Sequence, residues 1–163
     1  MNIIIGADHR GSEAATRLAE KLRTLSHHVE LVVPQQGQAA DYPDPAYVVG
    51  QAVSDGRMEI GVLIDGSGVG MCMAANKVKG VRAAPVHDEV TAEVSRAHID
   101  ANVICLSADL LGLRLMEKII DLFLKTTFQG GRHARRLEKI RAIEEGQDPR
   151  GLAPPGSMFE STG

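Results

Sequence analysis

The fold is decided by the stretch Glu59-Ile60-Gly61-Val62-Leu63-Ile64-Asp65-Gly66-Ser67-Gly68-Val69-Gly70. Its apolar first half, Glu59–Ile64, predicts a short strand buried on both faces of a sheet. Three glycines at every second position follow at once, and they allow a backbone turn to approach a ligand closely. Met71–Lys77 reads as a helix that begins on this turn, so the backbone N–H groups at the turn predict an anion site.

Strands and helices alternate along the rest of the chain, which predicts βαβ units around a parallel sheet. The expected strands are Met1–Gly6, His28–Val33, Glu59–Ile64, Gly80–Pro85 and Asn102–Leu106; the expected helices are Ser12–Leu25, Ala46–Ser54, Met71–Lys77, Val90–Ala97, Leu110–Leu124 and Arg132–Glu145. We therefore expect the α/β class, as a three-layer αβα fold. Its doubly wound five-stranded sheet would have a Rossmann-like or flavodoxin-like order, with a C-terminal helix added. Residues 1–146 would form one domain, and residues 147–163 an extended Gly/Pro-rich tail.

Composition excludes several classes of function. The chain has 163 residues, a net charge of −3, 3% aromatic residues and no tryptophan, which disfavours a nucleic-acid partner. No apolar run approaches the roughly 20 residues that span a bilayer. No cationic start is followed by an apolar stretch, so we expect a cytoplasmic protein. Cys72 and Cys105 lack a metal-type spacing, and their apolar surroundings favour reduced thiols.

Polar residues stand where the predicted strands end, the place where such sheets bind ligands. Asp8 and His9 follow the first strand, Asp65 follows the third, and His98 precedes the fifth. Asp65 could act as a general base, or equally serve as a turn or helix N-cap aspartate. His98 could protonate a sugar oxygen, although a histidine at a helix end is more often only a cap.

Two basic features could bind a phosphate. His9 and Arg10 could meet one after the first strand, although this is a common loop composition. Arg132 and Arg136 are four residues apart and share one face of the last predicted helix, so they could grip a phosphate dianion. A solvated charged face is the alternative. The glycine turn is neither the dinucleotide pattern G-x-G-x-x-G nor a P-loop, so a nucleotide cofactor is not expected.

Together these residues resemble a known family, the type B ribose-5-phosphate isomerases and the related galactose-6-phosphate isomerase subunits. The resemblance covers about residues 1–146. It rests on ordered short motifs: Gly6-Ala7-Asp8-His9, Asp41-Tyr42-Pro43, Asp65–Gly70 with Ala74-Ala75-Asn76-Lys77, Gly80-Val81-Arg82-Ala83, His98 with Asn102-Val103, and Gly130-Gly131-Arg132-His133 with Arg136.

The resemblance implies an enzyme that interconverts aldose and ketose phosphates, such as ribose 5-phosphate and ribulose 5-phosphate, through a cis-enediolate. It implies a homodimer or homotetramer with active sites shared between subunits, and neither metal nor cofactor. The implied roles are ring opening by Asp8 and His98, sugar contact by Ser67, pocket lining by Tyr42, phosphate binding by His9, Arg132 and Arg136, and an anion hole from Gly66, Gly68 and Gly70.

The chain departs from the family pattern at four positions. Many members have a cysteine base where Asp65 stands, and others a glutamate where Met71 stands; Asp65 is therefore the expected base, with Cys72 second. Ile99 replaces an asparagine, and Asp109 replaces an arginine that helps to bind phosphate. Another tetrose, pentose or hexose phosphate as substrate therefore remains an alternative. So does a non-catalytic binding paralogue or partner subunit, and a dinucleotide enzyme ranks third.

Overall fold

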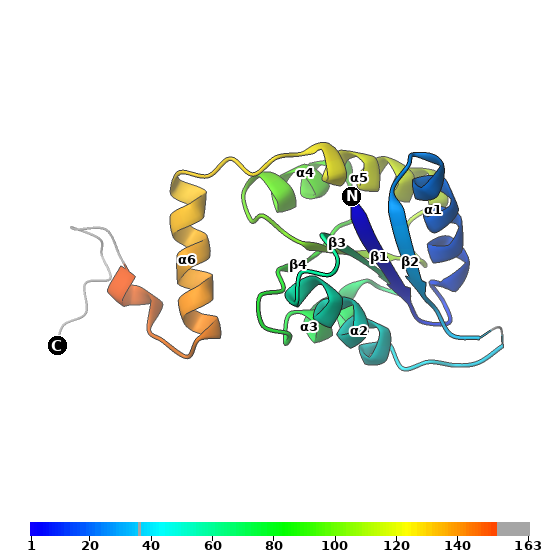
Figure 1. The fold of residues 1–163 in the computed structure, drawn as a ribbon, viewed down its shortest axis with the longest axis horizontal. Coiled ribbons are helices and arrows are strands. Elements are labelled where there is room, and N and C mark those ends of the chain that lie inside the picture. The colour runs from blue at the N-terminus through cyan, green and yellow to red at the C-terminus, as the bar shows by residue number, and fades with distance from the viewer. Residues whose placement is uncertain (36, 153–163) are drawn as a thin grey trace.

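The computed structural model describes residues 1–35 and 37–152, and it confirms the predicted parallel sheet (Figure 1). The five strands are all parallel and lie in the order β2-β1-β3-β5-β4. This order agrees with the flavodoxin-like order 2-1-3-4-5 over its first three strands and exchanges the last two. The strands are β1 (Asn2–Ala7), β2 (His28–Val32), β3 (Ile60–Asp65), β4 (Ala83–Pro85) and β5 (Val103–Ser107).

The helices also follow the predicted sequence of elements. They are α1 (Ser12–Thr24), α2 (Pro43–Ser54), α3 (Val69–Ala75), α4 (Glu89–Ala97), α5 (Leu113–Lys125) and α6 (Arg132–Glu144). Pro149–Leu152 form a short 3₁₀ helix, η1, inside the expected tail. The other expected tail residues from 153 onward lie outside the described residues. The division of the chain at residue 146 stays a prediction.

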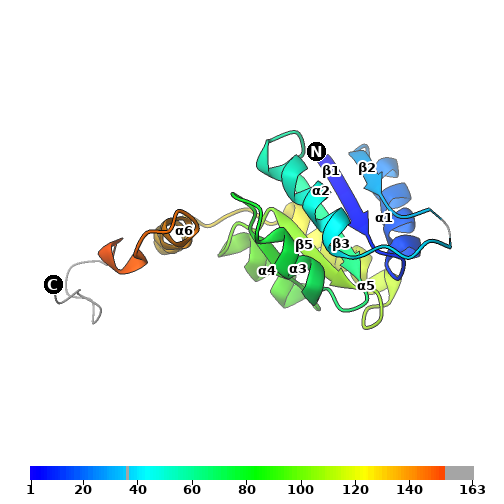
Figure 2. The ribbon, with the colours of Figure 1, turned by 90° about the horizontal axis from the view of Figure 1, so that it is seen from below.

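Two apolar cores fix the three layers (Figures 1 and 2). Helices α1, α4 and α5 cover one face of the sheet, where Ile3 and Ile5 of β1 point. Helices α2 and α3 cover the other face, where Ile4 points. This alternation along β1 follows from the period of two in a strand, and burial on both faces explains its unbroken apolar run. The predicted αβα architecture is confirmed.

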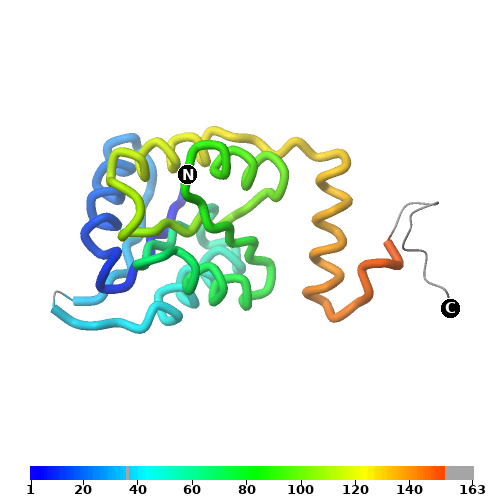
Figure 3. Tube along the Cα trace, turned by 180° about the vertical axis from the view of Figure 1, so that it is seen from behind, coloured from blue at the N-terminus to red at the C-terminus, as the bar shows by residue number. Residues whose placement is uncertain are grey.

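Helix α6 lies beyond the β4 edge of the sheet, apart from the three layers (Figures 1 and 3). Its start is held by His133, which is buried against His98 at the end of α4. Near its other end, the Glu144 carboxylate accepts a hydrogen bond of 2.7 Å from the Gly80 N–H. Ile140 and Ile143 on this helix remain exposed. Among residues 1–35 and 37–152, no helix has the length and apolar composition that a membrane crossing requires.

Candidate active site

A pocket of about 340 Å³ lies at the carboxyl ends of the central strands. The strand order switches there, because β2 lies on one side of β1 in the sheet and β3 lies on the other side. Six of its seven lining residues were expected from sequence, and the seventh is Asp109. The lining residues are Asp8, Tyr42, Asp65, Gly66, Ser67, Gly70 and Asp109.

The Asp65 carboxylate is buried inside the glycine-rich turn that follows β3. Its Oδ1 accepts hydrogen bonds from the N–H groups of Ser67 (2.9 Å) and Gly68. Its Oδ2 accepts one from the Met71 N–H at 3.1 Å. These bonds make Asp65 a turn aspartate that holds the start of α3. Oδ2 carries only one of the three bonds, so it is the oxygen with capacity to accept a proton.

Gly68 and Gly70 have different tasks in the turn. Gly68 has φ +79°, a left-handed conformation that favours glycine, and its N–H is already engaged by Asp65. The expectation that Gly68 supplies an anion-hole donor is therefore not supported, and Gly66 and Gly70 are left as candidates. Gly70 lies under the ring of Tyr42, where an added Cβ would be 2.8 Å from Tyr42 Cε2. The missing side chain thus lets the tyrosine close one side of the pocket.

Asp8 is a second buried carboxylate at the pocket, placed by the end of β1. Its Oδ1 accepts hydrogen bonds from the N–H groups of Arg10 (2.8 Å) and Gly11 (3.0 Å). The Asp8 N–H donates a hydrogen bond of 3.3 Å to the Ile64 carbonyl of β3, and the Asp8 carbonyl accepts one of 2.6 Å from the Ser12 hydroxyl. The Asp8 carboxylate is therefore fixed by backbone bonds on one oxygen, whereas backbone bonds hold both oxygens of Asp65.

Arg10 forms an ion pair with Asp109 at the carboxyl ends of the strands, beside the pocket. The sequence did not predict this contact. Arg10 Nε lies 3.1 Å from both carboxylate oxygens of Asp109, and Nη2 lies 2.6 Å from Oδ1. The hydrogen bond and the charge of Asp109 raise the pKa of Arg10, which stays protonated. Asp109 therefore does not present an unpaired negative charge to a ligand.

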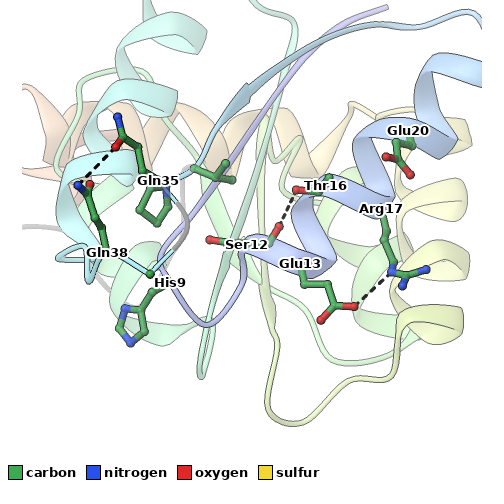
Figure 4. Close-up of a pocket in the computed structure, with 11 residues that line it drawn as sticks. His9, Ser12, Glu13, Thr16, Arg17, Glu20, Gln35 and Gln38 are labelled. Atoms are coloured by element: carbon green, nitrogen blue, oxygen red, sulfur yellow. Dashed lines mark hydrogen bonds and ion pairs between the residues drawn. The ribbon is translucent and has the colours of Figure 1, made fainter.

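His9 lies outside this pocket, beside a larger cavity of about 790 Å³ near α1 (Figure 4). That cavity has Arg17 and Glu13 on its wall, joined by an ion pair of 3.4 Å. His9 is the only residue of the predicted site that lines it. The smaller pocket holds the carboxylates and the glycine turn, so we place the chemistry there.

His98, Arg132 and Arg136 lie at a corner between α4 and α6 and do not line the pocket. His98 stacks on His133 with ring centroids 4.1 Å apart, and Arg132 Nε lies 3.5 Å from His133 Nε2. Burial, and then the charges of His98, Arg132 and Arg136, lower the pKa of His133. The Arg132 and Arg136 side chains are exposed. The corner is thus a cationic surface.

The alternative base, Cys72, faces the core between α2, α3 and the sheet. Its thiol donates to the Ala83 carbonyl at 3.4 Å, and it is not among the pocket residues. A hydrogen bond from Cys105 lowers the pKa of Cys72, whereas burial raises that of Cys105 well above its usual range. Both cysteines are free and buried. Met71 is buried in the same core. Neither Cys72 nor Met71 therefore replaces Asp65 at the pocket.

A doubly wound sheet with two fixed carboxylates and a glycine turn at its strand ends places the chain in the class of α/β proteins that bind a small ligand where the strand order switches. Among residues 1–35 and 37–152, no three His, Cys, Asp or Glu side chains group as metal ligands would. A model of the Ribose/Galactose Isomerase family matches residues 3–140. The chain belongs to this family, as the sequence resemblance predicted.

Individual relatives agree with this assignment. A probable ribose-5-phosphate isomerase B of Mycoplasma genitalium is 45% identical over 146 residues, covering 88% of this chain and 96% of the relative. A D-erythrulose-4-phosphate isomerase of Pectobacterium atrosepticum is 37% identical over 145 residues, covering 88% and 95%.

Solved structures match the fold equally well. Ribose-5-phosphate isomerase B of Clostridium thermocellum has a TM-score of 0.88 at 40% identity, covering 90% of this chain and 99% of that one. The Mycoplasma genitalium enzyme with bound ribulose-5-phosphate has a TM-score of 0.85 at 45% identity, covering 88% and 96%.

Proposed function

We propose that this protein is an aldose–ketose isomerase of phosphorylated sugars that interconverts ribose 5-phosphate and ribulose 5-phosphate. The observation that carries the proposal is the pocket itself, in which the buried Asp65 carboxylate lies in a glycine turn beside Asp8 and Ser67. The identity to ribose-5-phosphate isomerases supports the choice of substrate.

In the proposed reaction, Asp65 Oδ2 takes the proton from C2 of the open-chain aldose. The electron pair forms the C1–C2 double bond of a cis-enediolate, and the charge on the former carbonyl oxygen is held by N–H groups of the turn. Gly70 is the second residue of α3, so its N–H has no partner inside the helix and suits this task. The hydroxyl proton of the enediolate then moves from O2 to O1, Asp65 returns its proton to C1, and the C2 carbonyl of the ketose forms.

Ring opening precedes this step, and we assign it to Asp8 and His98. Asp8 would accept the proton of the ring hydroxyl, while His98 would protonate the ring oxygen. Ser67 is exposed at the pocket and would contact the sugar, and Tyr42 would cover it. His98 belongs to the α4–α6 corner and does not line the pocket of its own chain. The assignment therefore requires the corner of a second copy of the chain to reach the pocket.

Charge supports a site shared between two copies of the chain. Three carboxylates, those of Asp8, Asp65 and Asp109, line the pocket, and the guanidinium of Arg10 beside them is paired with Asp109. A phosphate dianion would be repelled by this arrangement alone. Arg132 and Arg136 would supply the missing cations if a second copy brought its α6 to the pocket. His9 of the chain that carries the pocket would then assist in binding the phosphate. We therefore propose a homodimer, or a homotetramer built from two such dimers. We also propose that the protein is cytoplasmic.

Exposed apolar residues support the same assembly. Tyr42 lines the pocket, and Tyr42, Tyr47, Val69 and Met73 expose apolar surface on α2, α3 and the segment before α2. Exposed apolar residues on the elements that carry a charge-incomplete site suit a symmetric interface, because their burial would help to exclude water from the reaction.

The proposal is tested by incubating the purified protein with pentose, tetrose and hexose phosphates in heavy water. Deuterium should enter C2 of ribose 5-phosphate while ribulose 5-phosphate forms. If none of these sugars exchanges above background, the isomerase proposal is rejected. Exchange in the tetrose phosphate alone would favour the second candidate, a tetrose-phosphate isomerase, which the 37% identity to the D-erythrulose-4-phosphate isomerase supports.

A further inference from the structure

The ion pair between Arg10 and Asp109 lies directly over the glycine turn of the pocket. A Cβ added to Gly66 would lie 3.1 Å from Arg10 Cδ and Nε and from Asp109 Oδ2. Arg10 comes from the loop after β1, and Asp109 from the loop after β5. These two strands flank β3, so the pair spans the strand end that carries Asp65.

Both backbones of the pair are fixed to the site. The Arg10 N–H donates to Asp8 Oδ1 at 2.8 Å, and the Asp109 N–H donates to the Gly66 carbonyl at 3.2 Å. The Ser107 hydroxyl donates to that same carbonyl at 2.6 Å. The backbones of Arg10 and Asp109 are therefore both bonded to residues that line the pocket.

The pair has little to do for the stability of the fold. Its side chains are 55% and 46% exposed, and water screens ion pairs of this kind, so they contribute little to folding. Asp55 and Arg57 form a comparable pair, with side chains 47% and 61% exposed, in the turn after α2. That second pair lies outside the pocket residues and serves as a matched reference.

Asp109 uses only part of the hydrogen-bonding capacity of Arg10. It engages Nε and Nη2, and within residues 1–35 and 37–152 no hydrogen bond or ion pair engages Nη1. A guanidinium carries five N–H donors in a fixed fork, so an oriented arginine can hold a carboxylate on one edge and a phosphate on another. Asp109 would then orient the fork and remove its own charge from the field of the ligand.

We propose that Arg10 binds the phosphate of the substrate and that Asp109 is its positioning residue. This inference rests on the proposed function for the identity of the substrate, and it adds a cation from the same subunit as the pocket. The phosphate would be held between Arg10 on one subunit and Arg132 and Arg136 on the other. Asp109 thus contributes to anion binding through Arg10, although an acidic residue beside a phosphate is unfavourable by itself.

The test compares Arg10→Ala, Asp109→Ala, the double variant and the reference Arg57→Ala in the full-length protein. Arg10→Ala should raise the KM for ribose 5-phosphate and the inhibition constant of inorganic phosphate by about 10–100-fold, with kcat within about threefold. Asp109→Ala should raise both by about three- to tenfold, because Arg10 loses its orientation. The double variant should bind phosphate better than Arg10→Ala, which leaves Asp109 unpaired.

Two readouts keep the inference separate from the proposed function. Calorimetric binding of inorganic phosphate reports the anion site even if the protein turns over no ribose 5-phosphate. Thermal unfolding should be unchanged in all four variants, because both pairs are exposed. Equal phosphate affinity of Arg10→Ala and the wild type would overturn the inference. So would an equal loss in Arg57→Ala, or a double variant that binds phosphate more weakly than Arg10→Ala.

Discussion

The pocket at the strand ends and the corner between α4 and α6 differ in charge and in the way their residues are held. Asp8 and Asp65 in the pocket are buried and fixed by backbone N–H groups of adjacent loops. Arg132 and Arg136 at the corner are exposed, on a helix that lies outside the layers of the sheet. In the proposed function, the pocket would move protons and the corner would bind the phosphate.

This difference indicates how one chain divides its work. In the proposed reaction, the pocket supplies the groups for proton transfer but has too few cations for a phosphate. The corner carries the cations but none of the buried carboxylates. A two-fold axis would bring each region of one copy to the complementary region of the other, and both sites would then be complete. The comparison can be broken by substitutions that affect one region only.

The largest effect is expected for Asp65→Asn in the pocket. The amide cannot accept the C2 proton, so kcat should fall by about 10²–10⁴-fold. Deuterium exchange at C2 of ribose 5-phosphate should fall in parallel, since it reports the same step. Asp55→Asn removes an exposed carboxylate that does not line the pocket, and it should leave both rates unchanged. A loss below tenfold in Asp65→Asn would assign the proton transfer to another group.

Substitutions at the corner should affect binding and spare the chemistry. Arg132→Ala and Arg136→Ala should each raise the KM for ribose 5-phosphate by about tenfold or more, with kcat reduced much less. Arg135 is an exposed arginine on the same helix and provides the matched control, because Arg135→Ala should change KM by less than about threefold. Equal losses in all three variants would indicate a general effect of charge.

Gly70→Ala tests how closely the turn and Tyr42 approach one another. The new methyl group would meet the tyrosine ring at 2.8 Å, so the ring must move away from the pocket. We expect kcat/KM to fall by about tenfold and stability by about 1–2 kcal/mol. In the described part of the chain, no atom lies within 4 Å of a Cβ added to Gly112, and Gly112→Ala should be neutral in both measurements. Unchanged kcat/KM in Gly70→Ala would exclude this contact as a functional one.

The smallest effect concerns the pH dependence of stability at the corner. The pKa of His133 is lowered in the fold from 6.5, first by burial, so the unfolded chain binds more protons than the folded one below that pH. The free energy of unfolding should therefore decrease as pH falls through and below 6.5. His133→Gln should flatten this dependence in denaturant titrations at several pH values. An identical slope in the variant would show that His133 does not contribute.

The sequence was sufficient to predict the order of the elements, because buried strands and amphipathic helices leave clear patterns. The predicted ends of two elements were wrong where a side chain accepts the hydrogen bond of a backbone N–H. The expected strand Gly80–Pro85 keeps only Ala83–Pro85, since the Arg82 N–H donates to the Asn102 side chain. The expected helix start at Leu110 moves to Leu113, because the Leu110 N–H donates to the Ser107 hydroxyl.

The site was predictable in its residue types and less so in its contacts. Asp65, Asp8 and Ser67 follow strands, so the topology alone brings them together. The pairing of Arg10 with Asp109 joins residues 99 positions apart, and it depends on which strands flank β3. The engagement of the Gly68 N–H by Asp65 depends on the left-handed conformation of that glycine, which a sequence pattern does not specify.

Hybrid dimers test the shared site most directly. The experiment mixes two variants, Asp65→Asn and the double variant Arg132→Ala/Arg136→Ala, each of which should be nearly inactive at low ribose 5-phosphate. The mixed subunits are dissociated and reassembled. Random exchange of equal amounts makes about half of the dimers mixed, and each mixed dimer has one intact site out of two. Activity should therefore recover to about one quarter of the wild-type value. Activity that stays at the average of the two separate variants would contradict the account, because each chain would then contain a complete site of its own.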